Sequence, residues 1–467
     1  MPSARHASSA LYVLAWLGTL AAEIAGWRLA GDLAGMAILG FLLLQFPHQR
    51  RYAQVLFVAL CVAGLAGVAA APDPLVLFLR GWRHGARYAA FFLALTALRD
   101  AAETSKLVRR CGAHLVAQPP GRRYAALNAG GHVFGIILSY GAIDLLGAMV
   151  ARANAQAAAQ PNGEDPALRG RRMLMAIYRG FCVMNCWSPL NIMTAVVSTA
   201  VPGAPMRLLL PAAFAVSVAM SVLGWAEDRQ FAPRRAAAAP DGRTRDGWSI
   251  HLGIIALVAL VMILAESANA FGHLSLVAAV TLIVPLVGFG WQIVQTHRLG
   301  PRRQPALLAR RGRRYLAHIP GFRGEATVLA ASGFMGTAIG GVLAHGGAGG
   351  LLAGLPPILV PLAVPVVLIA TGQIGLNPVA VVALLGAAIP HPGALGIPPA
   401  CLAFAYMLSW GMGIGMTPMS ASAITTARWA GVSPFTVSTI WNLRFTAGAL
   451  VLTWAAIAIA FAAFTAG

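Results

Sequence analysis

Two stretches of the chain place a hydroxyl residue directly before a proline and follow it with further hydroxyl and amide side chains. The first covers residues 185–203 and the second covers residues 413–431. Proline removes a backbone donor and clashes with the preceding turn, so each stretch predicts an interrupted helix within an apolar segment. Interrupted helices expose backbone carbonyls and amides that a solute or an ion can satisfy, which is the chemistry of a transport site.

These stretches supply most of the candidate residues for binding a solute or an ion. The first contributes Asn185, Ser188, Pro189, Asn191 and Thr194, and the second contributes Gly413, Gly415, Thr417, Pro418, Ser420 and Ser422. Glycine lets the backbone approach a ligand closely. The positive amino termini of half-helices favour an anionic solute, whereas carbonyl and hydroxyl oxygens can coordinate a cation. The alternative is that small and hydroxyl residues only let membrane helices pack together.

A glycine-rich segment precedes each stretch. Residues 125–141 and 329–345 share small residues at comparable spacing, and they add Asn128, Gly336 and Thr337 to the candidate site. The first segment, Tyr124–Val150, forms either one helix or a re-entrant hairpin. Basic linkers on both sides favour the hairpin, because it returns the chain to the face where arginines gather. The sequence therefore predicts an eroded repeat of hairpin and broken helix.

Few ionisable residues lie inside the apolar segments. Asp144 falls in the first glycine-rich segment, and because a carboxylate in lipid is costly it is our candidate proton carrier. The alternative is a boundary residue near the cytoplasmic mouth of the hairpin. Arg428 and Arg444 are expected at the inner interface, from which either could reach an anionic substrate. Cys182 and Cys186 lie four residues apart, but no second cysteine or histidine pair completes a zinc set, so we expect neither a metal site nor another cofactor.

Composition defines the class of protein. Of 467 residues, 58% are hydrophobic and only 10% are charged, and apolar runs long enough to span a bilayer recur along the chain. The formal charge of +20 comes from arginines beside those runs, which is the positive-inside pattern and excludes nucleic acid as the expected partner. We expect an all-α polytopic protein of the bacterial inner (cytoplasmic) membrane with about 10–13 transmembrane segments and a cytoplasmic amino terminus.

Charge and hydropathy also divide the chain. The expected parts are N-terminal scaffold helices at 1–99, a first repeat at 100–228, a cytoplasmic linker at 229–248, a scaffold helix pair at 249–295, and a basic loop with the second repeat at 296–467. Each repeat begins with a basic interfacial segment, and residues 99–123 are expected to lie on the membrane surface. Arginine placement makes the two proline-containing helices cross the membrane in opposite directions, as an inverted repeat requires.

The carboxy-terminal half carries a family pattern. Residues 371–378 read Thr-Gly-Gln-Ile-Gly-Leu-Asn-Pro, followed by the second proline-containing stretch and Ala-Gly-Val-Ser-Pro at 430–434. With the glycine-rich and basic segments, residues 100–460 resemble the ion transporter superfamily, especially divalent anion/sodium symporters, arsenite permease-like proteins and the large membrane subunit of tripartite periplasmic transporters. The resemblance implies two re-entrant hairpins, two unwound helices, frequent dimerisation and an elevator-type motion. The Ser-Asn-Thr triplet of the symporters' hairpin tips is absent, so the substrate and the coupling ion stay open.

The expected function is secondary active transport of a small anionic solute across the inner membrane, coupled to sodium or protons, by a chain that lies in the lipid bilayer and can pair as a homodimer. One alternative is a membrane-embedded enzyme acting on a lipid-linked substrate, although such enzymes gather charged residues on a large external loop and the expected outer loops are short and nearly uncharged. Another alternative is a membrane subunit of a larger transport complex. The Gly-x-x-x-x-Gly-Lys-Ser/Thr phosphate loop is absent, which argues against direct pumping by ATP.

Overall fold

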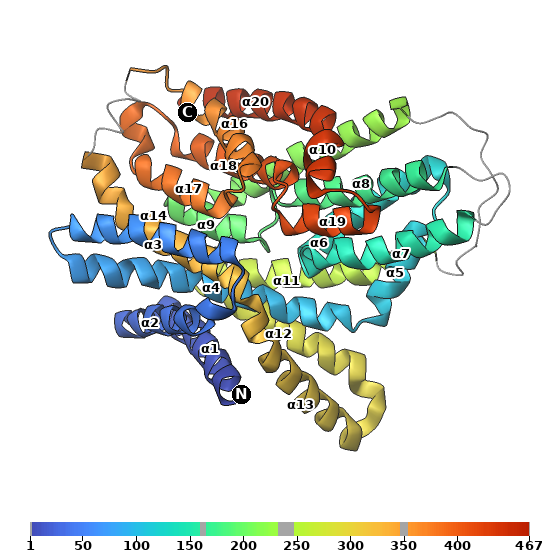
Figure 1. The fold of residues 1–467 in the computed structure, drawn as a ribbon, viewed down its shortest axis with the longest axis horizontal. Coiled ribbons are helices and arrows are strands. Elements are labelled where there is room, and N and C mark those ends of the chain that lie inside the picture. The colour runs from blue at the N-terminus through green and yellow to red at the C-terminus, as the bar shows by residue number, and fades with distance from the viewer. Residues whose placement is uncertain (1, 159–164, 232–246, 346–353, 467) are drawn as a thin grey trace.

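The computed structural model describes residues 2–158, 165–231, 247–345 and 354–466. The chain is all-α: 87% of it is helical, and the described residues contain no strand. Eight of the described helical segments are long and apolar enough to cross a membrane, and two further apolar helices are shorter. The expected class of polytopic helical membrane protein is therefore confirmed. Figure 1 shows the helices packed side by side in one bundle.

One group of helices surrounds a first hydrophobic core, which we call the scaffold core. Its helices are α1 (Pro2–Ala25), α2 (Arg28–Gln45), α3 (Arg51–Ala69), α4 (Pro74–Glu103) and α14 (Arg323–His345). Trp82 of α4 stacks on Phe334 of α14 with ring centroids 4.7 Å apart. The two helices approach closely near this contact because small residues face each other there. A Cβ at Gly333 would lie only 2.8 Å from the Gly85 Cα.

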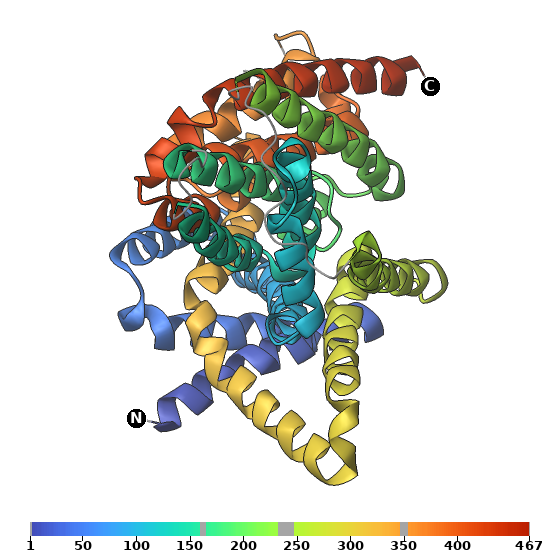
Figure 2. The same cartoon turned by 90° about the vertical axis from the view of Figure 1, so that its right-hand side faces the viewer.

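Three helices flank this core. They are α11 (Leu252–Phe271), α12 (Leu276–Thr296) and α13 (Gly300–His318). The basic loop expected after residue 295 is helical, and α12 and α13 form a V that projects from the other helices (Figure 2). No side chain of α13 is buried, and Tyr315 at its end anchors it to α4 by donating to the Leu93 carbonyl at 3.1 Å.

The second group of helices surrounds a larger core. Its members are α5 (Lys106–Val116), α6 (Pro120–Leu138), α7 (Gly141–Ala158), α8 (Pro166–Met184), α9 (Ile192–Ala200), α10 (Met206–Phe231), α16 (Leu359–Gln373), α17 (Pro378–Ala388), α18 (Pro399–Met416), α19 (Ala421–Ala430) and α20 (Leu443–Ala466). Short 3₁₀ turns are Phe46–His48, Trp248–His251, His297–Leu299, Ile319–Phe322 and Pro392–Leu395, and Thr436–Ile440 is one π-helical turn.

The packing of this second group follows one scheme twice. Helices α6 and α7 form one hairpin, in which α6 packs on α8 and α7 contacts α19. Helices α16 and α17 form the other hairpin, in which α16 packs on α18 and α17 contacts α9. Each hairpin therefore lies along one broken helix and touches the short half-helix of the other. Helices α8 and α18 cross in opposite chain directions, because Tyr178 meets Gly415 whereas Cys186 meets Leu408.

The first glycine-rich segment is a hairpin, as the arginine placement favours. Its turn lies at Ser139, whose φ of 52° is unusual for a residue with a side chain. The second glycine-rich segment is different: α14 is one described helix through residues 329–345, and it belongs to the scaffold core. The hairpin beside α18 is instead α16–α17, with its turn at residues 374–377. Residues 329–345 therefore do not form the hairpin beside α18 that the expected pairing with 125–141 requires, and α14 packs against α4, α3 and α17.

Helix α5 also differs from the expectation. It was expected on the membrane surface, but its apolar residues Val108, Leu115 and Val116 are buried. They pack against α6, α7 and α11, so protein covers the apolar face in place of lipid.

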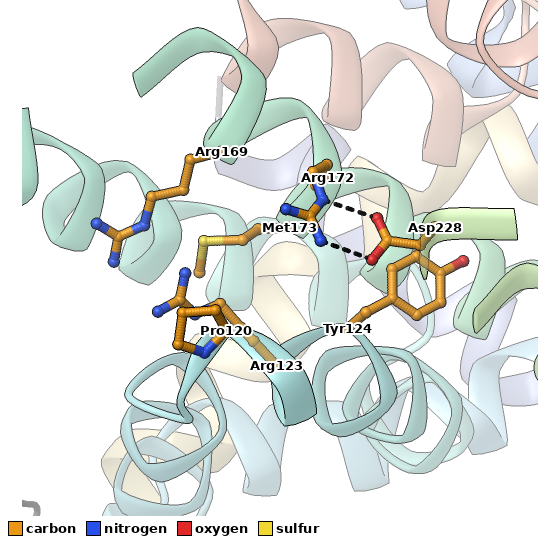
Figure 3. A pocket seen from close by; sticks show the side chains of 7 residues that line it. All are labelled: Pro120, Arg123, Tyr124, Arg169, Arg172, Met173 and Asp228. Atoms are coloured by element: carbon orange, nitrogen blue, oxygen red, sulfur yellow. Dashed lines mark hydrogen bonds and ion pairs between the residues drawn. The ribbon is translucent and has the colours of Figure 1, made fainter. Parts of the chain in front are cut away.

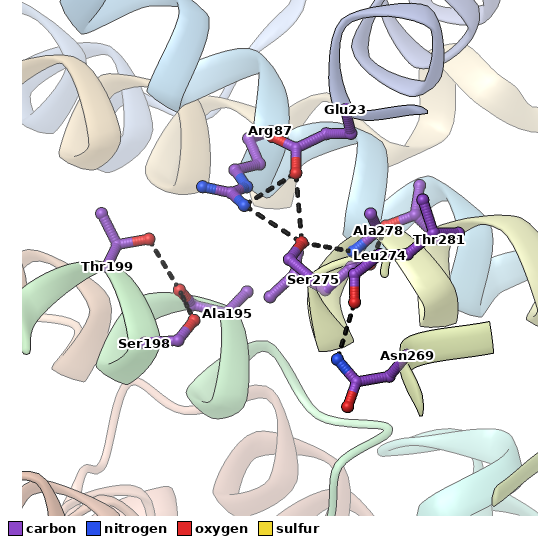
Figure 4. A network of polar contacts seen from close by, with 11 residues as sticks. Glu23, Arg87, Ala195, Ser198, Thr199, Asn269, Leu274, Ser275, Ala278 and Thr281 are labelled. Carbon is purple, nitrogen blue, oxygen red and sulfur yellow. Dashed lines mark hydrogen bonds and ion pairs between the residues drawn. The ribbon is translucent and has the colours of Figure 1, made fainter. Parts of the chain in front are cut away.

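Helix α4 carries charged residues along its length, and two of those in its first half pair with other scaffold helices. Arg83 pairs with Asp32 of α2 at 2.6 Å, and Arg87 pairs with Glu23 of α1 at 2.8 Å. Ser275 at the start of α12 donates to the same Glu23 carboxylate at 3.1 Å (Figure 4). Paired charges are tolerated within a bundle of membrane helices. Helix α9 contacts α4 beside this network, so the scaffold meets the first broken helix here.

Candidate functional site

The first break separates α8 from α9 at residues 185–191. Asn191 caps α9 by accepting the Met193 amide at 2.9 Å, and its side-chain amide also bonds Asn185. Ser188 is fully buried and accepts the Leu190 amide at 3.3 Å beside Pro189. The break is therefore stabilised by its own polar side chains.

A further hydroxyl of the first stretch spans this break. Thr194 donates to the Ser188 carbonyl at 3.0 Å, which is a carbonyl that a continuous helix would have used internally. Asn185 donates back to the Phe181 carbonyl at 2.7 Å. All five candidate residues of the first stretch thus lie at one interruption, as their spacing indicates.

The second break separates α18 from α19 at residues 417–420. Thr417 donates to the Gly413 carbonyl at 2.6 Å, and Pro418 follows directly. Ser420 caps α19 by accepting the Ala423 amide at 3.1 Å and lies 3.1 Å from the Ser422 hydroxyl. The structure therefore brings the candidate residues of the second stretch together at a second half-helix amino terminus.

Three side chains that sequence reasoning missed satisfy carbonyls freed at the second break. Gln373, at the end of α16, donates to the Met416 carbonyl and accepts Thr439 at 3.2 Å. Asn442 donates to the Gly415 carbonyl at 3.0 Å, and Tyr178 donates to the same oxygen at 3.0 Å. Gln373 lies within the 371–378 pattern, so that pattern could have pointed to a residue at the second break.

A cavity lies where the two broken helices cross. It is small and is lined by Cys182, Val183, Cys186, Met220, Gly411, Met412, Gly415, Asn442, Phe445 and Thr446. The glycines allow the crossing, because a Cβ at Gly411 would overlap the Cys186 sulfur. Only Gly415 of the candidate residues lines this cavity, and the hydroxyls at the breaks are bonded within the protein in this conformation.

Both hairpin turns touch the scaffold. Tyr140, at the α6–α7 turn, donates to the Glu325 carboxylate of α14 at 3.1 Å, and the Arg99 guanidinium of α4 lies 4.5 Å from its ring centroid. At the α16–α17 turn, Tyr52 of α3 donates to the Gly375 carbonyl. Gly375 has a φ of 90°, which favours glycine. The two turns thus reach different scaffold helices through few polar contacts.

Asp144 is half exposed, which of the two readings of the sequence fits the boundary residue better than a carboxylate buried in lipid. It lies on α7 with 52% of its side chain exposed and pairs with Arg428 of α19 at 2.5 Å. The Trp429 indole donates to the same oxygen at 2.9 Å. The pair links the first hairpin to the second broken helix, and more than half of each side chain is exposed at the protein surface.

The remaining candidate residues lie away from the interruptions. Asn128 donates to the Ala176 carbonyl at 3.2 Å, a packing contact between α6 and α8. Gly336 faces Ala383 of α17, and Thr337 donates to the Gly333 carbonyl at 2.9 Å within α14. The structure therefore does not bring these three residues to either break.

Arg179 is a buried cation that ties the second break to its surroundings. It pairs with Glu227 of α10 at 3.0 Å and donates to Asn442 at 3.1 Å and to the Trp441 carbonyl at 3.2 Å. Its guanidinium also lies 4.8 Å from the Phe445 ring centroid. Over the described part of the chain, no group of three or more histidine, cysteine or acidic residues is arranged to hold a metal.

Comparison with known proteins gives structural likeness alone. No family model matches the sequence, and no curated protein matches it at a significant level. The solved structures that match include the YdaH transporter of Alcanivorax borkumensis, with a TM-score of 0.59 and 18% identity over 88% of this chain and 99% of that one. MtrF of Neisseria gonorrhoeae, described as illuminating a class of antimetabolite efflux pumps, matches with a TM-score of 0.54 and 14% identity over 87% of this chain and 94% of that one. This chain therefore shares the fold of two membrane transporters.

Proposed function

We propose that the protein is a secondary active transporter that moves a small anionic solute across the inner membrane, coupled to protons or sodium. One observation carries the proposal: two interrupted helices cross in opposite chain directions, and a hairpin turn docks beside the second break through Gln373. Interrupted membrane helices at corresponding places are where transporters bind their solutes. The shared fold with two transporters supports the same class.

The electrostatics of the breaks favour an anion. Half-helices α9 and α19 both begin at the breaks, and helix amino termini carry partial positive charge. Arg428 adds a full charge at the other end of α19, where it is held by Asp144. A proton on Asp144 would release Arg428 to an anionic solute, so the pair couples proton and solute in this scheme. Sodium coordinated by hydroxyls and carbonyls at the breaks is the other coupling ion to test.

We propose an elevator-type motion in which the polar contacts of the hairpin turns, Tyr140 with Glu325 and Tyr52 with Gly375, exchange while α17 slides along α14. We extend the proposal to membership of the ion transporter superfamily, an inverted repeat, a cytoplasmic amino terminus and a homodimer. The packing of a hairpin on a broken helix occurs twice in the chain, which supports the inverted repeat.

Proteoliposome uptake tests the proposal. Purified protein is reconstituted and offered a panel of labelled carboxylates, sulfonates and inorganic oxyanions, with an imposed proton gradient, an imposed sodium gradient or neither. The expected result is accumulation of at least one anion that collapses when the gradient is dissipated. Correctly folded protein that produces no gradient-dependent flux of any member of the panel would sink the proposal.

A further inference from the structure

Helix α13 concentrates positive charge on a part of the protein that no transport role accounts for. It carries six arginines and no acidic residue, and residues 267–324, which include it, contain no aspartate or glutamate at all. The helix connects α12 to α14 through short 3₁₀ turns at both ends. Because α12 and α14 belong to the helical bundle, α13 is held beside the membrane at each end.

Four of these arginines form one exposed face of α13, which we call the arginine face. The four are Arg302, Arg303, Arg310 and Arg313. A helix turns by about 100° per residue, which places all four within an arc of about 100°. Exposed Pro305, Ala309 and Leu316 fall in the neighbouring arc, and 46% of the Leu316 side chain is exposed. The exposed half of α13 therefore carries a cationic strip beside an apolar strip.

The opposite side of α13 is the one held by the protein. Tyr315 lies about 170° from the centre of the arginine face, and its hydroxyl donates to the Leu93 carbonyl of α4 at 3.1 Å. The Asp100 carboxylate of α4 lies within electrostatic range of Arg311 and Arg314, which are not part of the arginine face. The contacts of α13 with the bundle thus leave the arginine face pointing away from it.

The charge of the arginine face is not balanced within the protein. Several arginines elsewhere have carboxylate partners: Arg172 donates twice to Asp228, with both bonds 2.9 Å long (Figure 3), and Arg179 pairs with Glu227 at 3.0 Å. Among the described residues, by contrast, no carboxylate forms an ion pair with the arginine face. This face is therefore available to an anionic partner from outside the chain.

The direction of α13 limits which partner can reach this face. The long helices α3 and α4 mark the direction across the membrane, and the V of α12 and α13 projects sideways from them (Figure 1, Figure 2). A helix that leaves a membrane bundle sideways extends over the surrounding lipid. An amphipathic helix with arginines on its polar side lies in the membrane interface, with its apolar side chains toward the acyl chains and its cations at the phosphates.

We propose that the arginine face binds the headgroups of anionic phospholipids in the leaflet that α13 overlies. An anionic leaflet attracts basic segments next to membrane helices, and each arginine near its surface contributes about fivefold to binding. Charge alone would suit any polyanion, but the apolar strip and the sideways position fit a lipid surface. Bound lipid would anchor α13 and the scaffold helices on either side of it. This inference does not depend on the transported solute.

Hydrogen exchange measured by mass spectrometry tests the proposal on the full-length protein in lipid nanodiscs. One set of nanodiscs holds phosphatidylcholine alone, and the other holds phosphatidylcholine mixed with phosphatidylglycerol. We expect the amides of α13 to exchange at least roughly tenfold more slowly with phosphatidylglycerol, whereas those of α3 exchange alike in both. The difference should shrink in molar salt, because the Debye length falls to about 3 Å.

Two variants with the same loss of charge identify the residues responsible. The test variant combines Arg302→Gln, Arg303→Gln, Arg310→Gln and Arg313→Gln. The control variant removes four exposed arginines from other segments, by Arg50→Gln, Arg51→Gln, Arg109→Gln and Arg122→Gln. We expect phosphatidylglycerol to lose its effect on α13 in the test variant and to keep it in the control variant.

Three outcomes would overturn the proposal. Equal exchange of α13 in the two kinds of nanodisc would show that the arginine face does not meet anionic lipid. Loss of the phosphatidylglycerol effect in the control variant as well would show attraction by net charge alone. Protection that needs two copies of the protein per nanodisc, whatever the lipid, would show that a second copy covers the face. Unchanged exchange of the scaffold-core helices establishes that each variant is folded, and solute uptake need not be measured.

Discussion

Arg179 offers the sharpest test of how the second break is held. Its side chain is 6% exposed and its partner Glu227 is 19% exposed, with 3.0 Å between Nη1 and Oε2. Removing one member of a buried pair leaves the other charge without compensation, which costs about 3–5 kcal/mol. Arg179→Gln also removes the hydrogen bonds that Arg179 donates to the Asn442 side chain and to the Trp441 carbonyl. We therefore expect a loss of about 3–5 kcal/mol, or roughly a hundredfold to a few thousandfold in the folding equilibrium.

Equilibrium unfolding in mixed micelles of sodium dodecyl sulfate and dodecyl maltoside measures this loss. The chain supplies a matched control in Arg207, which pairs with Glu266 at 2.6 Å but is 64% exposed, with its partner 47% exposed. Exposed pairs are worth about 0–1 kcal/mol, so Arg207→Gln is expected to cost less than about 1 kcal/mol. The double variant Arg179→Gln/Glu227→Gln should regain most of the loss, because it removes both charges. Equal costs for Arg179→Gln and Arg207→Gln would refute the reasoning.

Three further predictions concern the hairpins and the half-helices. Asp144→Asn should abolish proton-driven accumulation in proteoliposomes while solute exchange without a gradient persists; unchanged proton-driven accumulation would show that Asp144 has no part in coupling. Gly180→Ala should cost about 1–3 kcal/mol of stability in the same micelle assay, because its Cβ would overlap α6 backbone, whereas Gly121→Ala has open space and should be neutral. Ser420→Ala should cost about 0.5–2 kcal/mol through the lost cap of α19, and an unchanged unfolding midpoint would contradict the cap.

Local chemistry explains which features the sequence predicted. Proline and capping side chains act on their own turn, so Asn191 and Ser420 could be placed at helix interruptions without knowledge of the fold. The α6–α7 hairpin followed from arginines in the linkers, a signal that the membrane itself imposes. The 371–378 pattern contains the turn between α16 and α17, but both the hairpin and the bond from Gln373 to the second break were found only in the structure.

Long-range packing explains what the sequence did not predict. The glycines of α14 resemble those of the first hairpin, but they serve a helix crossing in which Gly333 meets Gly85 of α4. The sequence also does not show why arginines are tolerated within α4, because their partners Glu23 and Asp32 lie on other helices. Glycine content thus indicates close packing and does not reveal which helix lies opposite.

The central claim is that the two helix interruptions together form the solute site, and gradient-driven uptake by Pro189→Ala and Pro418→Ala tests it most directly. Each substitution restores a backbone donor at a break and removes the steric obstacle to a continuous helix. Arg122→Gln serves as the control for insertion and orientation in the vesicles. We predict that both alanine variants, folded by size-exclusion, lose most of the uptake that the control retains. Uptake at the wild-type rate by both of them would contradict the account.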